Sequence, residues 1–320
     1  MMKFRTPVRP PQSPFRITPQ SRILSLGSCF ARHTGDFLRE RFFPVSVNPA
    51  GTMFNPVSVL RIVRRMAAER MFKEEDLFYH DGMWKSFELY TLFNRPDKNE
   101  FLENANSMLQ RASQFIDSAD TVIVTYGTAR VYEVKQTREI AANCHKLPAE
   151  RFRTRLLETA EIEQAVSELY QVLKRRNPAL RFIFSVSPVR YLQDGPTLNT
   201  VSKGRLIDAV FDFTRRHPDD TYYFPAYEIF MDDLRGYRFY DTDLVHPGAE
   251  GITYALELFT ETFFDEEGKI LLKDAEKLYK LLQHRPRNAS SREERQWLNR
   301  KRELAERLRR AYPLMEWPRV

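Results

Sequence analysis

The stretch Ile23-Leu-Ser-Leu-Gly27-Ser28-Cys29 constrains the fold more than any other part of the chain. A short apolar run rich in branched residues leads into Gly-Ser-Cys, and apolar side chains then recur at helical spacing through Phe37 and Leu38. This pattern predicts a strand, a tight turn at Gly27 and a helix. A serine at this turn could be the N-cap of the following helix. Because open α/β sheets bind ligands at such strand ends, Ser28 could instead belong to a functional site.

Short apolar strands alternate with helical patterns along most of the chain. Strands are predicted near residues 22–27, 44–48, 120–125, 180–187 and 221–224. Asn55-Pro56 is typical of a capped helix start. Asp81-Gly82 predicts a hairpin turn, and residues 131–134 and 139–142 are expected to form a second hairpin. The alternation predicts an α/β fold with a mainly parallel sheet, small β-hairpin insertions and a C-terminal helical extension.

Composition divides the chain into three regions. Residues 1–20 contain five prolines and predict an extended arm, residues 21–268 carry the α/β pattern, and residues 269–320 form a basic helical extension. From His284 onward there are eleven Lys and Arg against five Glu, whereas the rest of the chain has 39 against 38. The tail therefore supplies six of the seven net positive charges. Interspersed Glu and Arg favour a docked helix with a solvated face over a surface for nucleic acid or anionic lipid.

Other compositional features bear on the setting of the protein. No apolar run is long enough to span a bilayer, and the basic N-terminus lacks the apolar core of a secretory signal. Cys29 and Cys144 are too few for a disulfide scaffold. We therefore expect a cytoplasmic protein with free thiols.

One Ser-His-Asp set places all its members at expected strand ends. A serine nucleophile needs a neutral imidazole to take its proton and a carboxylate to orient that imidazole. Asp243-Leu-Val-His246 supplies both groups near the start of a later helix. The alternative for this motif is a helix cap beside a structural histidine.

The order of these motifs resembles the SGNH, or GDSL-like, hydrolase superfamily, whose fold is a three-layer sandwich. The sequence Gly27-Ser28-Cys29-Phe30-Ala31 spells the signature of the GSCFA family, which is similar to those hydrolases. Further matching stretches are residues 48–56, 125–129, 143–146, 187–190, 223–228 and 243–247. The tail lies outside the resemblance.

The resemblance implies a site and an activity. Ser28 would be the nucleophile, His246 the general base and Asp243 the orienting carboxylate, with the backbone N–H groups of Ser28 and Gly51 in the oxyanion hole. In the third conserved sequence block of the wider superfamily, the side-chain amide of an Asn adds a donor to the oxyanion hole. This chain has Gly127-Thr128-Ala129 at that place, so Thr128, Asn55 or Asn143 would have to supply the donor. The predicted substrate contacts are Gly127, Tyr126, Arg190 and His145.

Other assignments compete for the same residues. Cys29 with His33 could act as a thiol nucleophile, but one helical face would hold both away from Asp243. Cys29, His33, Cys144 and His145 match no established zinc spacing, so no metal is predicted, and no cofactor either. Tyr126, Arg130, Tyr132, Arg190 and Lys203 could line a polar pocket above the sheet.

Two functions remain open on the sequence. The first is a serine esterase or acyl-transfer enzyme acting on small-molecule or saccharide O-acyl esters, a substrate class that rests on the family analogy. The second is a binding or scaffold protein that keeps the fold without catalysis, suggested by the absent third-block Asn and the basic tail. The sequence is silent on the oligomeric state.

Overall fold

The computed structural model describes residues 5–193, 195–284 and 292–318. Within these residues the central sheet has five parallel strands in the order β10-β9-β5-β1-β2. The strands are β1 (Ile23–Gly27), β2 (Val45–Val47), β5 (Thr121–Tyr126), β9 (Arg181–Val186) and β10 (Thr221–Tyr223). The α/β class with a mainly parallel sheet, predicted from the alternating pattern, is confirmed.

The strand order reverses between β1 and β5, because the chain goes outward from β1 to β2 and then returns to the other side of β1. Gly27 pairs in register with Thr125, and Thr125 pairs with Ser185, so the ends of β1, β5 and β9 lie level. Open sheets of this kind place their ligands outside the carboxyl ends at such a reversal. The topology therefore brings Ser28, Gly127 and Ser187 to one edge.

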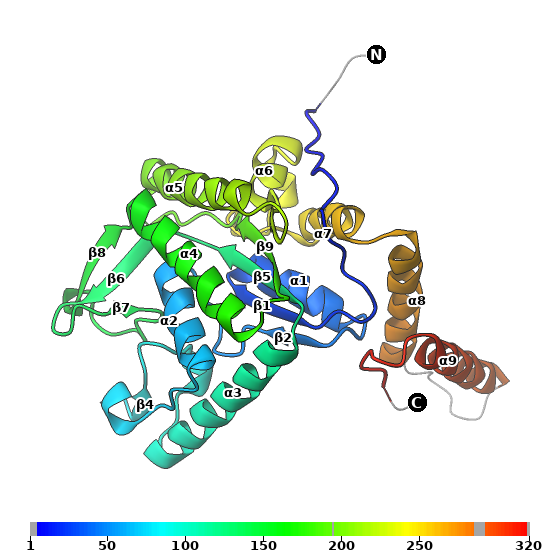
Figure 1. The fold of residues 1–320 in the computed structure, drawn as a ribbon, viewed down its shortest axis with the longest axis horizontal. Coiled ribbons are helices and arrows are strands. Elements are labelled where there is room, and N and C mark those ends of the chain that lie inside the picture. The colour runs from blue at the N-terminus through cyan, green and yellow to red at the C-terminus, as the bar shows by residue number, and fades with distance from the viewer. Residues whose placement is uncertain (1–4, 194, 285–291, 319–320) are drawn as a thin grey trace.

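Alternating side chains of the central strands pack on two separate layers of helices. Leu24, Val122 and Phe182 contact one core, whereas Ile23, Ile123 and Ile183 contact the other. Figure 1 shows α2, α3 and α4 on one side of the sheet, and α1 and α7 on the other. The fold is accordingly a three-layer sandwich. The helices are α1 (Cys29–Arg39), α2 (Pro56–Ala67), α3 (Lys98–Ser118), α4 (Thr159–Arg176), α5 (Gly195–Arg216), α6 (Ala226–Glu228), α7 (Ala249–Phe263), α8 (Glu266–Gln283) and α9 (Arg292–Ala311).

Small antiparallel strands are added at the edges, as expected. β3 (Phe78–His80) and β4 (Met83–Lys85) form the hairpin predicted at Asp81-Gly82, where both turn residues have positive φ. β6 (Arg130–Val134) pairs with β7 (Ile140–Ala141), which confirms the second hairpin. β8 (Phe152–Leu156) also pairs with β6, although no strand was predicted there. Its sequence carries two arginines, so pairing with β6 determines its strand conformation more than apolar patterning does.

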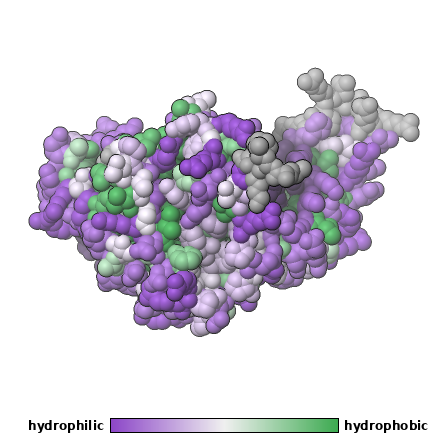
Figure 2. All heavy atoms as spheres, turned by 90° about the horizontal axis from the view of Figure 1, so that it is seen from above, coloured by the Kyte–Doolittle hydropathy of each residue, from purple (hydrophilic) through white to green (hydrophobic). Residues whose placement is uncertain are grey.

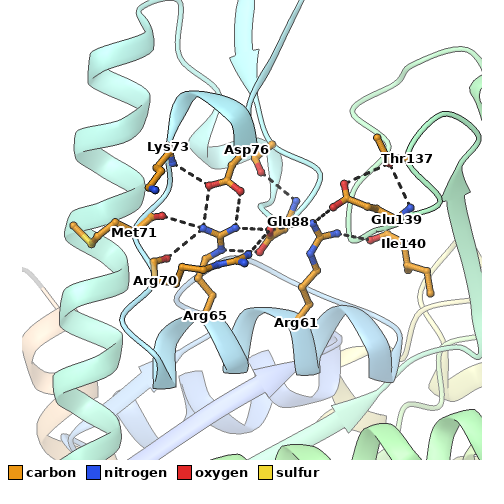
Figure 3. Close-up of polar contacts among 11 residues, drawn as sticks. Arg61, Arg65, Arg70, Met71, Lys73, Asp76, Glu88, Thr137, Glu139 and Ile140 are labelled. Atoms are coloured by element: carbon orange, nitrogen blue, oxygen red, sulfur yellow. Dashed lines mark hydrogen bonds and ion pairs between the residues drawn. The ribbon is translucent and has the colours of Figure 1, made fainter.

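A buried charge network fixes the β3–β4 insertion to helix α2 (Figure 3). The Arg65 guanidinium donates two hydrogen bonds to Glu88 and two to Asp76, at 2.7–3.1 Å. Arg65 also donates to the carbonyls of Arg70 and Met71. Such bidentate pairing satisfies a charge that burial would otherwise make costly.

Described segments near the two termini contact the α/β domain. In the N-terminal arm, Phe15 and Ile17 are buried, and the Ile17 N–H donates to the carbonyl of Phe263 at 2.9 Å. At the other end, α9 packs against α8, and the Trp317 ring lies 5.1 Å from that of Phe42. Figure 1 shows α8 and α9 projecting from the main body. The docked helix expected for the tail is therefore observed for its described residues, although residues 285–291 and 319–320 lie outside them.

The face of the molecule that lies above the view of Figure 1 is largely polar (Figure 2). Seen from above (Figure 2), this face is mostly hydrophilic, and its hydrophobic residues form scattered small groups. No helix in the described ranges is both long enough and apolar enough to cross a bilayer.

Candidate active site

The turn after β1 holds Ser28 at the edge of the sheet. Gly27 has φ +117°, and a Cβ at this position would lie 2.1 Å from the carbonyl oxygen of Thr125, so only glycine fits. Ser28 occupies the N-cap position of α1, yet its hydroxyl makes no capping hydrogen bond. The hydroxyl is buried without a partner among the described residues. The side chain of Ser28 therefore does not perform the capping role that was its alternative.

Asp243 and His246 form a hydrogen-bonded pair in the loop before α7. Asp243 Oδ2 lies 2.6 Å from His246 Nδ1, while Oδ1 accepts from the backbone N–H groups of Val245 and His246, each at 2.9 Å. These backbone bonds and the imidazole hydrogen bond lower the pKa of Asp243 to about 2. The carboxylate is therefore charged at neutral pH, and it fixes the Nδ1–H tautomer, which leaves Nε2 as the free imidazole nitrogen.

Arg190 supports this loop from the end of β9. Its guanidinium donates to the carbonyl of Leu244, which has φ +58°, and it lies over the rings of Tyr237 and Tyr240 at 5.4 and 5.3 Å. Arg190, predicted as a substrate contact, also lines the cavity beside Ser28. These contacts show that Arg190 holds the loop that carries His246.

Two cavities meet at His246. The first, of about 500 Å³, is called the Ser28 cavity here, and its lining includes Ser28, Cys29, Phe54, Asn55, Gly127, Thr128, Asn143, Ser187, Arg190 and His246. The second, of about 560 Å³, is lined by Cys29, His33, Ser187 and His246 among others. The structure thus brings Ser28 and His246 to one cavity, but it forms no hydrogen bond between His246 and the Ser28 hydroxyl.

The predicted backbone donors of the oxyanion hole are both engaged. The Ser28 N–H donates to the carbonyl of Thr125 at 2.9 Å, because the β1–β5 ladder continues one residue past the strand. The Gly51 N–H donates to the carbonyl of Asn48 at 2.7 Å, which closes the turn after β2. Gly51 also does not line the Ser28 cavity. In this structure the two predicted N–H groups are therefore not directed at a substrate oxygen.

The three side chains considered as the additional oxyanion-hole donor all line the Ser28 cavity, but their hydrogen-bond partners differ. The Thr128 hydroxyl is shared with Ser202 and with the Arg130 N–H. Asn143 Oδ1 accepts from the His145 N–H in a surface loop. Asn55 Oδ1 caps α2 by accepting from the Ser58 N–H at 2.8 Å, and Asn55 is only 5% exposed. Because the cap fixes the oxygen, the Asn55 amide N–H₂ is the end left for the cavity.

Two predicted substrate contacts lie elsewhere and are corrected here. Tyr126 is fully buried, stacks on Phe184 at 6.5 Å, and burial raises the pKa of its hydroxyl. It is the last residue of β5, and strand alternation directs its side chain into the core, leaving Gly127 at the cavity. His145 is buried, and its Nε2 lies 2.8 Å from the carbonyl oxygen of Ser86, on the hairpin insertion. It joins two insertions rather than contacting a ligand.

Gly127, predicted as a substrate contact, lines the Ser28 cavity and lies next to Ser28. A Cβ at Gly127 would lie 3.3 Å from Ser28 Cβ and 3.2 Å from the Phe54 ring. A larger residue would therefore press on both Ser28 and the cavity wall.

Lys203 was expected above the sheet, but it lies beneath the cavity floor. It is 1% exposed, and its Nζ donates to the carbonyls of Gly127 and Ser187, each at 2.6 Å. The signal was present in the sequence, because Lys203 shares a helical stripe with Leu206 and Val210, both of which are buried.

The cysteines and histidines are separated in the structure. Cys29 and His33 line the second cavity, and burial together with the charge of Arg32 lowers the pKa of His33. Cys144 lies across the Ser28 cavity, and burial raises the pKa of its thiol to about 11. Among the residues that the structure describes, no three His, Cys, Asp or Glu side chains gather in a way that could hold a metal ion.

Together these features define an α/β protein whose candidate site lies at the reversal point of a doubly wound sheet, with a Ser, a His and an Asp contributed by two loops. The sequence profile of the GSCFA family matches residues 22–259, which include the whole central sheet and the Asp243–His246 loop. The chain belongs to this family. A comparison with curated proteins finds no match.

Proposed function

We propose that the protein is a serine hydrolase or acyl-transfer enzyme of SGNH-like type, acting on O-acyl esters. One observation carries this proposal. The Asp243–His246 pair, joined at 2.6 Å, and the unpartnered hydroxyl of Ser28 line the same cavity. A buried hydroxyl without a partner is uncommon in proteins, and a catalytic role is one explanation for such a group.

Ser28, His246 and Asp243 each have a distinct role in the proposed reaction. His246 Nε2 removes the proton of Ser28 as Ser28 Oγ bonds to the ester carbonyl carbon, and the carbonyl oxygen becomes an oxyanion. When the oxyanion collapses, the bond to the alcohol oxygen breaks and His246 returns the proton to that oxygen. Water, or a second alcohol, then attacks the acyl carbon with His246 again acting as base. As this second oxyanion collapses, the bond to Ser28 Oγ breaks and His246 returns the proton to Ser28. Asp243 stays ionised and orients the ring.

Asn55 is the donor we assign to the oxyanion. Its amide orientation is fixed by the α2 cap, and its neighbour Phe54 accepts hydrogen bonds from the N–H groups of Gly127 and Thr128. Asn55 is thereby tied to the strand end next to Ser28. A fixed donor of this kind stabilises the developing charge without reorganisation.

The Ser28 cavity is large enough to hold more of an ester than its acetyl group. Its volume of about 500 Å³ lies within the range typical of small-molecule sites, and its wall combines Phe54, Tyr132 and Val189 with Asn143 and Thr128. An acylated saccharide or a comparable hydroxylated alcohol fits this mixture. Both cysteines are free thiols, which is consistent with a reducing, cytoplasmic setting as part of the proposal.

A binding protein without catalysis is the second candidate. It is favoured by the missing hydrogen bond to the Ser28 hydroxyl and by the engaged N–H groups of Ser28 and Gly51. Catalysis requires the half-exposed His246 side chain to approach Ser28 when substrate binds, since catalytic hydrogen bonds in ligand-free sites are often loose.

A pair of neighbouring substitutions tests the proposal. Wild-type protein should hydrolyse a p-nitrophenyl ester and be labelled by a fluorophosphonate at Ser28. Ser28→Ala should lower kcat by about 10⁴-fold or more and abolish labelling, whereas Cys29→Ala should change kcat only a few-fold. Inactivation by Cys29→Ala alone would instead identify a thiol nucleophile. Wild-type protein that neither turns over nor labels would leave the binding protein as the answer.

A further inference from the structure

Lys203 is a buried cation that the proposed reaction does not use. It lies on α5 with 1% of its surface exposed, and its ammonium group donates hydrogen bonds of 2.6 Å to two neutral carbonyl oxygens. In the described part of the chain, no carboxylate forms an ion pair with it. Removing an ammonium group from water without a counter-charge is costly, so its retention calls for an explanation.

The two carbonyls belong to the residues that follow β5 and β9. Gly127 and Ser187 both line the Ser28 cavity, and Gly127 packs against the Ser28 side chain. Lys203 therefore ties together two strand ends that form the cavity floor. The bonds also turn the negative ends of these two carbonyl dipoles toward the ammonium group and away from the cavity.

The surroundings of the ammonium group make its charge sensitive to pH. Burial lowers the pKa of Lys203 to about 7. Two titratable groups face it from the neighbouring elements, namely Cys29 of α1 and Tyr227 of α6, whose ring centre is 5.8 Å from Nζ. Burial also raises the pKa of Tyr227, so its hydroxyl is neutral in this range.

We propose that Lys203 is a positioning residue of the candidate site, whose buried ammonium group fixes the Gly127 and Ser187 carbonyls and places a positive charge behind Ser28. The charge favours the anion that forms as Ser28 attacks an ester carbonyl. This inference rests on the proposed function, because it assigns Lys203 to the same acyl-transfer step.

Lys203→Met removes the charge and the hydrogen bonds with little change in length. It should lower kcat for the p-nitrophenyl ester by about 10- to 100-fold with KM nearly unchanged, less than the direct loss of an oxyanion donor. Wild-type kcat should also fall as the pH rises through about 7, since Lys203 then loses its proton. The methionine variant should lack this decline.

Lys174→Met is the matched control. Lys174 also donates to a backbone carbonyl, that of Pro178, but it lies on α4 near the start of β9, pairs with Asp220 and does not line either cavity. Its loss should leave both kcat and the pH profile unchanged. Near-ultraviolet circular dichroism should show that each variant is folded.

The outcomes separate the two proposals. Active wild-type protein with normal kcat and a normal pH profile in Lys203→Met overturns the role of Lys203 alone. Wild-type protein that neither turns over nor labels at Ser28 overturns the proposed function, and the role of Lys203 with it. If Lys203→Met does not fold, the wild-type profile decides, because the absence of a decline above about pH 7 contradicts the proposal.

Discussion

Arg65 and Lys203 are both buried cations that donate to two backbone carbonyls, but among the described residues only Arg65 is also paired with carboxylates. Arg65 meets two carboxylates, two carbonyls and the face of Phe72, with its guanidinium 4.1 Å from the ring centre. Lys203 meets two carbonyls, and no carboxylate of the described residues pairs with it. Figure 3 shows the hydrogen bonds from the Arg65 guanidinium to Asp76 and Glu88 and to the carbonyls of Arg70 and Met71.

The difference separates a structural charge from one that is available for chemistry. The field of Arg65 is cancelled at close range by Asp76 and Glu88, so the network holds the hairpin insertion in place and projects little potential beyond it. Among the described residues no acid cancels the field of Lys203, which lies behind the Ser28 cavity. Burial alone would not have distinguished the two.

Removal of Arg65 should have the largest effect on stability. Arg65→Met leaves Glu88, whose side chain is 3% exposed, without its main partner. The free energy of unfolding should fall by about 3–5 kcal/mol in urea titrations. Arg64→Met is the control, since Arg64 pairs with Glu168 at the surface and should cost about 1 kcal/mol or less. A loss below that of the control would show that the Arg65 network is not structural.

Unlike Arg65, the buried ammonium group of Lys203 should lower the free energy of unfolding, and its effect should depend on pH. Its pKa is lowered from 10.5 to about 7 in the folded state, so between these values the unfolded chain binds one more proton than the folded chain. The free energy of unfolding of wild type should therefore rise with pH, relative to Lys203→Met, by about 1 kcal/mol per pH unit above pH 7. Parallel urea titrations at about pH 7.5 and 9.5 measure this. Identical pH dependence in both proteins would place the Lys203 pKa outside this range.

Arg190 should give the smallest effect, confined to activity. Arg190→Met removes the hydrogen bond to the Leu244 carbonyl and loosens the loop that carries Asp243 and His246. We expect kcat to fall about 10-fold, which corresponds to about 1.4 kcal/mol, with little loss of stability. Arg205→Met removes a comparable bond to the Leu157 carbonyl and should leave kcat unchanged. Equal effects of the two variants on kcat would contradict a specific role for Arg190.

Much of the architecture was predictable because it depends on local patterns. The strand-turn-helix at Gly27, the Asn55-Pro56 cap and the Asp81-Gly82 turn each follow from backbone preferences of a few neighbouring residues. The β8 strand was not predictable in this way, because its polar sequence becomes a strand by pairing with β6. Strand order likewise required long-range contacts.

The site shows the same division. The Asp243-x-x-His246 pair could be predicted from its spacing, since both residues belong to one loop. The position of Tyr126 could not, because one residue of strand alternation decides whether a side chain enters the core or the cavity. The hydrogen bonds that engage the N–H groups of Ser28 and Gly51 could not be predicted either, because each depends on how a neighbouring strand or turn closes.

The amino-acid order alone indicates which residues could take part in chemistry: a serine after a glycine turn, an Asp-His pair in one loop, and an α/β alternation that brings strand ends to one edge. Long-range contacts in the fold establish which of these residues share a cavity, that Arg190 supports the loop, and that Lys203 lies beneath Gly127 and Ser187. Backbone preferences act over a few neighbouring residues, whereas burial, hydrogen-bond partners and charge compensation arise between segments far apart in the chain.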